Sequence, residues 1–444
     1  MRRILTLALL YGAMQLVMPL AAHDASAPAT LLIFGFLVLA AYTSGELAAL
    51  ASLPKITGYL VAGVIFGPSL IGIVTPAAIE QLEPVNRLAV ALIAFLAGVE
   101  LRWGELKARG RAILTMLGLE LTLSFVAIAL VLWLLRAHIP FLRELDPGPV
   151  LVLCALFASV TMVHSPAVTM ALLTETRAQG PVARTTLGIV LVADVVVVLV
   201  FSGMLSVTRA SIPTAAGAPV ASAAVITWEI LGSLVVGALL GGAVALYMRF
   251  VQRELLLFAI VIAFFGAEIA RITHVETLLT LVTAGFVTEN VSSGDEGRAL
   301  LHAMERSAVP VFVVFFALAG AAINLSVLAV LWPLALAVVA VRAGALFAGS
   351  SLGARWAGAP RAVQRHAWLG LIAQAGVANG LAGILAAAVP EYGVPMQTLI
   401  LSVIAINAVA GQILFRIALA RSGEVEAAAG AAVPAPAPRA ASGG

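Results

Sequence analysis

The sequence predicts an all-α polytopic membrane protein with about 13 transmembrane helices, and three observations support this. Of the 444 residues, 62% are hydrophobic and only 11% are charged, with a mean hydropathy of +1.10. Many apolar runs are long enough to cross roughly 30 Å of hydrocarbon. Two of these runs are interrupted by polar residues near their centres. A soluble chain of this length could not bury so much apolar surface.

The first 27 residues allow two interpretations. Residues 1–27 begin with two arginines, continue with an apolar stretch and end with small residues, which is the layout of a signal peptide. The same stretch could be an extra N-terminal helix that is not cleaved. Both alternatives deliver the next segment to the outside of the membrane.

The predicted transmembrane domain covers residues 28–421. Within it we expect membrane helices at 30–52, 54–74, 86–101, 111–136, 148–174, 181–207, 225–248, 254–270, 275–290, 307–323, 327–350, 366–389 and 396–419. Residues 422–444 form an Ala- and Pro-rich tail whose composition predicts disorder.

The distribution of basic residues predicts the orientation. If the helix at 30–52 starts outside, only five of the 25 lysines and arginines lie in outer loops: Arg87, Arg136, Arg143, Arg209 and Arg271. Cytoplasmic loops of membrane proteins are enriched in Lys and Arg, so this orientation is favoured and the C-terminus is cytoplasmic. The basic pI of about 9.3 then reflects these loops and does not indicate nucleic-acid binding.

Signals for enzymatic chemistry are absent from the sequence. It has no phosphate-binding loop, no HExxH, no G-x-S-x-G and no cysteine cluster. The single cysteine, Cys154, cannot form an intramolecular disulfide. We therefore expect neither an enzyme nor a cofactor, and no resident metal ion.

Two of the predicted helices are broken near mid-membrane. In 148–174, Pro166 follows a polar string and removes a backbone donor, which frees the carbonyl of Met162. In 366–389, Gln374, Gly376 and Asn379 lie together in the middle of the span. Freed backbone groups at this depth are tolerated only where they are buried in protein or line a cavity. Paired interruptions of this kind indicate the central site of a transporter.

The helices that follow the two breaks also correspond. Asp194 lies near the middle of the first follower and Asn407 near the middle of the second. Both the break and the next helix, with its central polar residue, occur twice in the chain. This recurrence predicts an inverted repeat. The alternative is that Gly and Pro are simply common in membrane helices.

Asp194 is the first candidate for a functional residue. A carboxylate in an apolar span is costly and usually marks an ion pathway or a proton relay. Such a group can hold a proton or a monovalent cation but not both, and this competition is a mechanism for exchange. The alternative is a protonated acid that only forms a hydrogen bond between helices.

Three polar residues of the first break are candidate partners of Asp194. His164 could face Asp194 and relay protons, or it could be a hydrogen-bonded packing residue. Thr161 and Ser165 offer hydroxyl oxygens to a partly dehydrated Na⁺ or K⁺, or they could cap half-helices.

Two opposite charges lie in other spans. Glu268 and Arg342 are predicted to form a structural ion pair, because a buried charge without a partner is strongly unfavourable.

Four stretches, in order along residues 30–421, resemble the monovalent cation:proton antiporter-2 family, which includes Kef-type K⁺/H⁺ and several Na⁺/H⁺ antiporters. "LPKITGYLVAGVIFGPSLIGIV" is similar to the family signature P-x-x-x-G-Y-L-x-A-G-x-x-x-G-P-S-x-x-G. "IAFLAGVEL", "VPVFVVFFALAGAAINLS" and "GLIAQAGVANGLAG" resemble three later motifs of the family.

The resemblance implies a 13-helix fold with two crossing broken helices, a mobile core domain and a homodimer. Asp194 falls at the position of the ion-carrying Asp, but Ala193 precedes it where relatives usually have Asp, Asn or Gln. Electrogenic relatives tend to carry a lysine in the helix placed at 307–323, and this sequence has none there. We therefore expect electroneutral exchange. Gln412 stands where relatives often have Pro.

The predicted function is exchange of Na⁺ or K⁺ for H⁺ by alternating access, with a monovalent cation, H⁺ and the lipid bilayer as partners. The expected location is the cell membrane of a bacterium. Two alternatives keep the fold: a carrier of an organic anion, because helix N-termini suit anions, and a membrane sensor that transports nothing.

Overall fold

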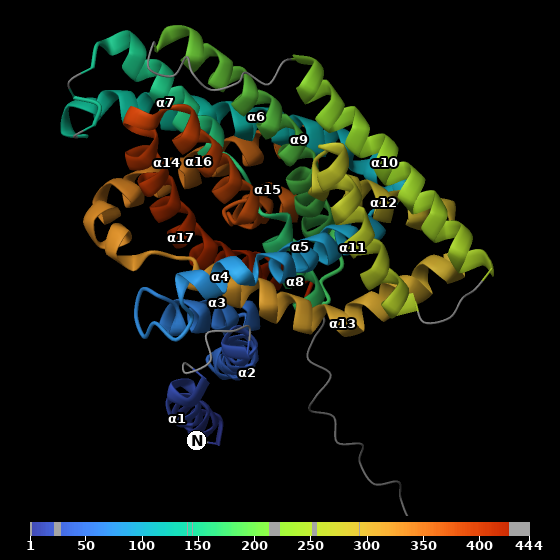
Figure 1. Cartoon of the computed structure of the whole chain (residues 1–444). Helices are drawn as coiled ribbons and strands as arrows, with labels where there is room; N and C mark the ends of the chain where they lie inside the picture. Colours follow the sequence, from blue (N-terminus) through green and yellow to red (C-terminus); the bar gives the residue numbers. More distant parts are fainter. Residues whose placement is uncertain are drawn as a thin grey trace, which may run out of the picture.

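The computed structural model describes residues 2–21, 28–139, 141–143, 145–212, 223–250, 255–292 and 294–425. Throughout these residues the regular secondary structure is helical, as Figure 1 shows. The first helix, α1 (Arg2–Ala21), lies at one edge of the molecule against α2. The remaining helices form two lobes. Each lobe combines segments from both halves of the sequence.

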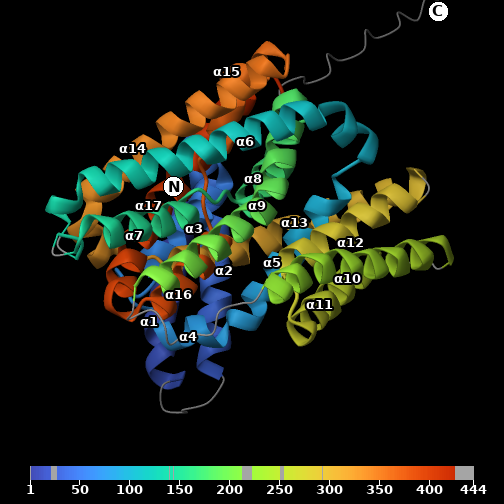
Figure 2. The same ribbon diagram turned by 90° about the horizontal axis from the view of Figure 1, so that it is seen from above.

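We call the first group the crossing lobe, because it contains both broken helices. Its members are α6 (Trp103–Leu134), α7 (Pro147–Thr161), α8 (Pro166–Thr176), α9 (Pro181–Ser211), α14 (Leu325–Trp356), α15 (Arg361–Gly370), α16 (Gly376–Ala388) and α17 (Pro390–Arg421). In Figure 2, α6, α14 and α15 lie together along one side of the molecule.

The second group is called the flanking lobe. It contains α2 (Pro28–Leu50), α3 (Lys55–Phe66), α4 (Pro76–Gln81), α5 (Glu83–Val99), α10 (Ala223–Phe250), α11 (Leu255–Thr273), α12 (Thr277–Val291) and α13 (Gly294–Ala321). Figure 2 places α10, α11 and α12 side by side, away from α14 and α15.

Every predicted membrane segment contains helix, and the two segments predicted to be broken each contain two half-helices. Seven helical stretches are long and apolar enough to cross a membrane, and four shorter apolar helices accompany them among the described residues. The chain is therefore a multi-pass membrane protein, while 13 crossings stay a prediction. The segment expected at 54–74 ends as a helix at Phe66, because Gly67 and Pro68 follow.

Close backbone contacts stiffen the flanking lobe. A Cβ atom added at Gly98 of α5 would lie 2.1 Å from the carbonyl oxygen of Val282 in α12, and one at Gly285 would lie 2.2 Å from that of Phe95. Small residues allow membrane helices to approach this closely. The resulting van der Waals contact stabilises their packing in a bilayer, where the hydrophobic effect does not drive helices together.

Contacts in the crossing lobe correspond between the two halves of the chain, as a repeat would require, while inversion of the repeat stays a prediction. α9 packs against the half-helix α15, and α17 packs against the half-helix α7. α6 and α14 also correspond and pack together, with Gly349 and Gly353 of α14 against the backbone of α6. Each long follower helix therefore supports the broken helix of the other half.

The chain returns to the crossing lobe after α17. The carboxylate of Glu424 accepts hydrogen bonds of 2.8 Å from the backbone N–H groups of Val182 and Ala183, in the first turn of α9. α9 has no side-chain cap from its own N-cap residue, Gly180. Part of the tail predicted at 422–444 thus completes the helix that carries Asp194, while residues 426–444 lie outside the described part.

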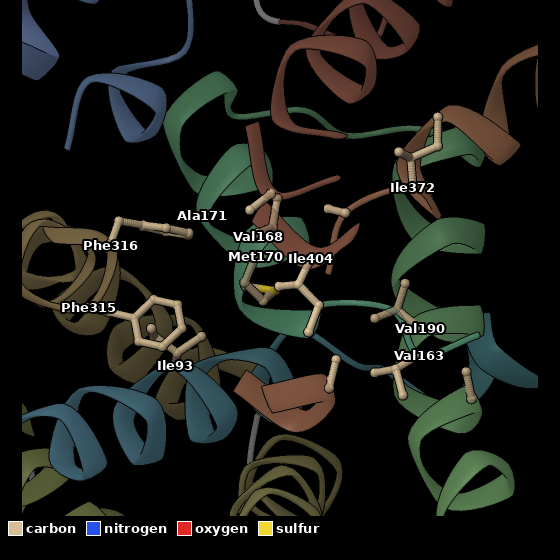
Figure 3. Close-up of a cluster of buried hydrophobic side chains, with 14 of the residues drawn as sticks. Ile93, Val163, Val168, Met170, Ala171, Val190, Phe315, Phe316, Ile372 and Ile404 are labelled. Atoms are coloured by element: carbon tan, nitrogen blue, oxygen red, sulfur yellow. The ribbon is translucent and has the colours of Figure 1, made fainter. Parts of the chain in front are cut away.

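An apolar cluster fills the contact between the lobes. Figure 3 shows Phe315, Phe316 and Ile93 of the flanking lobe beside the side chains of α8. The α8 residues are Val168, Met170 and Ala171, all buried. This part of the contact between the lobes is apolar, so sliding of one lobe over the other would break no hydrogen bond among these side chains.

Candidate functional site

The first break separates α7 from α8. Residues 162–165 connect the two half-helices, and Pro166 is the first residue of α8. Ser165 is the N-cap residue, and its hydroxyl accepts a hydrogen bond of 3.2 Å from the N–H of Val168. Proline suits the first helical position because its missing N–H would be unpaired there.

The second break separates α15 from α16. Residues 371–375 connect the half-helices, and Gly376 begins α16 without a side-chain cap. The Gln374 side chain donates a hydrogen bond of 2.7 Å to the carbonyl of Thr161 in the first break. It also accepts one of 2.7 Å from the Asn407 side chain of α17. This buried chain ties both breaks and one follower helix together.

Arg342 of α14 lies at the negative ends of two half-helices. Its guanidinium donates to the carbonyls of Ile372 at 2.7 Å, Val163 at 2.8 Å and Leu371 at 3.1 Å. These carbonyls follow the C-termini of α15 and α7, where the helix dipoles place partial negative charge. Arg342 is only 1% exposed, and therefore it neutralises both ends inside the protein.

Arg342 is balanced by Glu120, which sequence reasoning missed. His164 lies between them: its Nε2 is 2.9 Å from Glu120 Oε1, and its Nδ1 is 3.2 Å from Arg342 Nη2 and 2.8 Å from the Leu371 carbonyl oxygen. Glu120 and His164 are fully buried. The expectation that His164 faces Asp194 is therefore wrong, because both ring nitrogens point into this network.

The predicted ion pair between Glu268 and Arg342 is also wrong. Glu268 pairs with Arg271, three residues later on the same helix, and both side chains are about half exposed. Arg342 satisfies its charge with backbone carbonyls and nearby Glu120. The sequence held a signal for this outcome, since an acid and a base three residues apart on a helix can pair locally. Glu120 then remains as an isolated acid within an apolar span.

A cavity of about 690 Å³ lies between the two lobes. From the crossing lobe it is lined by Ser165 and Pro166 at the start of α8, by Asp194 of α9 and by Gly376 at the start of α16. The flanking lobe contributes charged residues, namely Glu83, Arg87, Glu229, Glu268, Arg271 and Glu276. Both positive half-helix ends thus border the same space as Asp194.

Asp194 has one buried oxygen, Oδ1, that has no hydrogen-bond partner among the described residues. Its neighbour Ala193 is fully buried and offers no side-chain polar group. A buried acceptor without a partner is unfavourable, so this oxygen favours a bound proton or a cation. Asp194 therefore lies on the cavity wall and has a buried oxygen that needs a partner.

The other predicted site residues divide between cavity and protein interior. Thr161 directs its hydroxyl to the carbonyls of Phe157 and Ala158 in its own helix. Asn379 is exposed. Neither residue is part of the cavity lining. Of the four candidates for cation and proton binding, the cavity therefore brings together only Asp194 and Ser165.

Two further acids in the cavity wall were not singled out from the sequence. Glu276 caps the first turn of α12 by accepting a hydrogen bond from the N–H of Leu279. Glu229 lies on α10 and is half-buried. The sequence held one signal for Glu276: it directly precedes a helical run, at 277–291 in the structure. An acid at that position can cap the helix.

The family profile described as "Sodium/hydrogen exchanger, transmembrane" matches residues 8–420. The chain belongs to the sodium/hydrogen exchanger family. This family consists of membrane transporters that exchange cations for protons, which confirms the antiporter resemblance drawn from the sequence. The Kef-type subgroup stays a prediction. No curated protein sequence gives a significant match.

Solved structures support the same fold. A structure of the sodium proton antiporter MjNhaP1 from Methanocaldococcus jannaschii at pH 8 is 17% identical, with a TM-score of 0.64, and covers 88% of this chain and 96% of that one. An electron-microscopy structure of the same antiporter is 16% identical, with a TM-score of 0.68, and covers 89% and 98%. This exchanger therefore has the fold of a sodium proton antiporter over nearly its whole length.

Proposed function

We propose that this exchanger transports Na⁺ or K⁺ in one direction and H⁺ in the other, with Asp194 as the site that both ions share. The cavity next to Asp194 is the entry path in the present conformation. The observation that carries the proposal is Asp194 Oδ1, which is buried at the cavity wall without a hydrogen-bond partner among the described residues. Either a proton or a partly dehydrated cation would satisfy this oxygen.

Further ligands would come from groups beside Asp194. The Ser165 hydroxyl oxygen lies at the cavity wall, although it also caps α8. Hydroxyl and carboxylate oxygens are hard ligands, which suit alkali cations. Thr161 and His164 are assigned a supporting role, because their polar groups bind the breaks rather than face the cavity.

The charges of the cavity favour a cation over an organic anion. Asp194, Glu229 and Glu276 all line it. The two arginines in the wall are each paired with an acid of the same wall, Arg271 with Glu268 and Arg87 with Glu83. Arg342 is not part of the lining. An anion would need positive charge close to Asp194, whereas the positive half-helix ends there face a carboxylate.

We further propose electroneutral exchange of one cation for one proton. No basic side chain lies in the described lining on the crossing lobe, so Asp194 has no cationic partner that could release a second proton. The basic residues in the loops favour a cytoplasmic C-terminus. The cavity mouth, with Glu83, Arg87, Glu268 and Arg271, then opens to the outside. A homodimer in a bacterial cell membrane is proposed from the family alone.

The test is cation-driven proton flux in proteoliposomes that hold an inward-acid pH gradient. We expect Na⁺, K⁺ or Li⁺ added outside to collapse the gradient with the wild-type chain and not with Asp194→Asn. Glu268→Gln is the matched control, because it removes an acid from the same cavity wall at an exposed position. Equal loss in both variants, or full activity of Asp194→Asn, would contradict the proposal.

A further inference from the structure

Two hydrogen bonds join the first turn of α3 to the crossing lobe. The backbone N–H of Lys55 donates to Glu175 Oε1 at the end of α8, at 2.7 Å. The hydroxyl of Thr57 donates to Gln412 Oε1 of α17, at 2.8 Å. α3 belongs to the flanking lobe, so both bonds cross from one lobe to the other. Figure 1 shows α3 (blue) beside the lower part of α17 (red).

These bonds lie at the end of the molecule opposite the cavity mouth. The mouth is at the start of α5, which the chain reaches from the C-terminal end of α3. The N-terminal turn of α3 is therefore at the other end. Likewise α8 begins at the cavity with Ser165 and ends at Glu175, about 15 Å away at 1.5 Å per residue.

The lobes meet closely at the opposite end. A crevice of about 30 Å³ lies there between the end of α5, α6, α8 and α9. Such a gap holds about one water molecule. Leu187 lines it and is 2% exposed. The two hydrogen bonds of α3 thus lie at the end where the lobes meet tightly.

Each side chain from the crossing lobe is only partly satisfied by these bonds. Gln412 is fully buried, and its Nε2 has no partner among the described residues. Glu175 Oε2 is in the same condition. A contact that leaves buried polar atoms unpaired is weaker than a fully paired one, and water would satisfy both groups once the lobes separated there.

We propose that Glu175 and Gln412 form a latch with the first turn of α3 that holds the end opposite the cavity closed, and that this latch opens when the ion site turns to that end. This proposal rests on the proposed function, because an exchanger that works by alternating access must close each end of its ion path in turn. Glu175 replaces the missing N-cap of α3, because Pro54 at that position provides no side-chain cap. Both residues lie on helices that also reach the site, α8 through Ser165 and α17 through Asn407.

The experiment measures which end is accessible, using single cysteine probes and a membrane-impermeant maleimide applied from either side. Ala267→Cys reports on the cavity and Leu187→Cys on the crevice. The wild-type chain supplies the blank, because its single cysteine, Cys154, is buried. Each probe is combined with Thr57→Val, Glu175→Ala, or both; alanine at position 175 removes the acceptor, whereas glutamine would keep it.

We expect the double latch variant to label about threefold to tenfold faster at Leu187→Cys and correspondingly slower at Ala267→Cys, from the loss of two hydrogen bonds. The control variants change similar bonds within one lobe. Thr288→Val removes a bond from Thr288 to the Gly241 carbonyl in the flanking lobe, and Glu424→Ala removes the cap of α9 in the crossing lobe. A purely structural role would change both probes in the same direction.

Unchanged labelling in the double latch variant, or equal shifts in the control variants, would overturn the latch. Flux is measured separately on the same proteins. Opposite shifts of the probes without cation-driven proton flux in the wild type would keep the latch and reject the proposed cargo. Normal flux with unchanged probes would reject the latch alone.

Discussion

Arg342 shows how one residue resolves the electrostatic problem that two broken helices create. Each break exposes the carbonyl end of a half-helix inside the protein, and both ends meet at the same guanidinium. Arginine suits this position because its planar group carries several donors that reach different carbonyls at once. Asp194 occupies the opposite situation, beside the two positive half-helix ends.

Replacement of Arg342 tests this account. We expect Arg342→Ala to lower the free energy of unfolding by about 3 to 5 kcal/mol, because Glu120 is left as an uncompensated buried charge. Thermal unfolding of the purified protein in detergent would show this as a lower transition temperature. The double variant Arg342→Ala with Glu120→Gln should recover part of the loss, and an additive loss would show that the two residues act independently.

Sequence reasoning located the residues that break a pattern and missed the residues that pair. Pro166, Asp194 and Gln374 interrupt apolar runs, so their unusual positions were visible without a structure. The partner of Arg342 was not visible, because Glu268 and Glu120 are both acids in apolar spans and only the packing of α6 against α14 distinguishes them. Pairing across helices depends on which faces meet.

At the level of single helices, α9 depends on a residue far away in the sequence. Its first turn has no cap of its own, and Glu424 supplies one from beyond α17. Gly180 is required for this contact, since a Cβ there would lie 2.3 Å from the Glu424 side chain. The length of α9 was predicted well from its apolar run, whereas its cap could not be predicted from any local signal.

Truncation of the C-terminus separates the cap from the rest of the tail. A chain ending at Arg421 should lose about 0.5 to 2 kcal/mol of helix stability at the start of α9, the usual cost of a missing N-cap. Hydrogen exchange at the amides of Val182 and Ala183 should accelerate accordingly. A chain ending at Val425 keeps Glu424 and should exchange like the full-length protein. Faster exchange in both would assign the effect to residues 426–444 instead.

At the level of the whole molecule, contacts within a lobe differ from contacts between the lobes. Glycines bring α5 and α12 of the flanking lobe into backbone contact. The contact between the lobes is formed mainly by apolar side chains such as Phe315 and Met170, with the hydrogen bonds of Lys55 and Thr57 at one end. A stiff lobe beside an apolar sliding surface is suited to rigid-body motion of one lobe against the other.

The charge balance of the whole cycle can be tested with a membrane potential. Exchange of one cation for one proton moves no net charge, so a potential imposed with valinomycin and K⁺ should leave the Na⁺-driven flux unchanged. Movement of one net charge would couple the cycle to about 2.3 kcal/mol per 100 mV. A flux that changes severalfold with potential would therefore reject electroneutral exchange, and liposomes without protein supply the leak rate.

Global architecture was the part most accessible from sequence, since hydropathy, the two breaks and their followers already indicate a repeated membrane fold. The division into lobes was not accessible in the same way, because each lobe mixes helices from both halves of the chain. The cavity between them depends on that mixing. Its acids Glu229 and Glu276 come from helices whose apolar pattern gives no indication of where they face.

The contact between Glu424 and the start of α9 also bears on biogenesis. Ribosomes deliver α9 to the membrane more than 200 residues before Glu424 is synthesised. The first turn of α9 must therefore wait, uncapped, until the segment that follows α17 has been made. A quality-control protease that recognises exposed helix ends would find this site open in every chain that lacks Glu424 and closed in every folded chain that contains it.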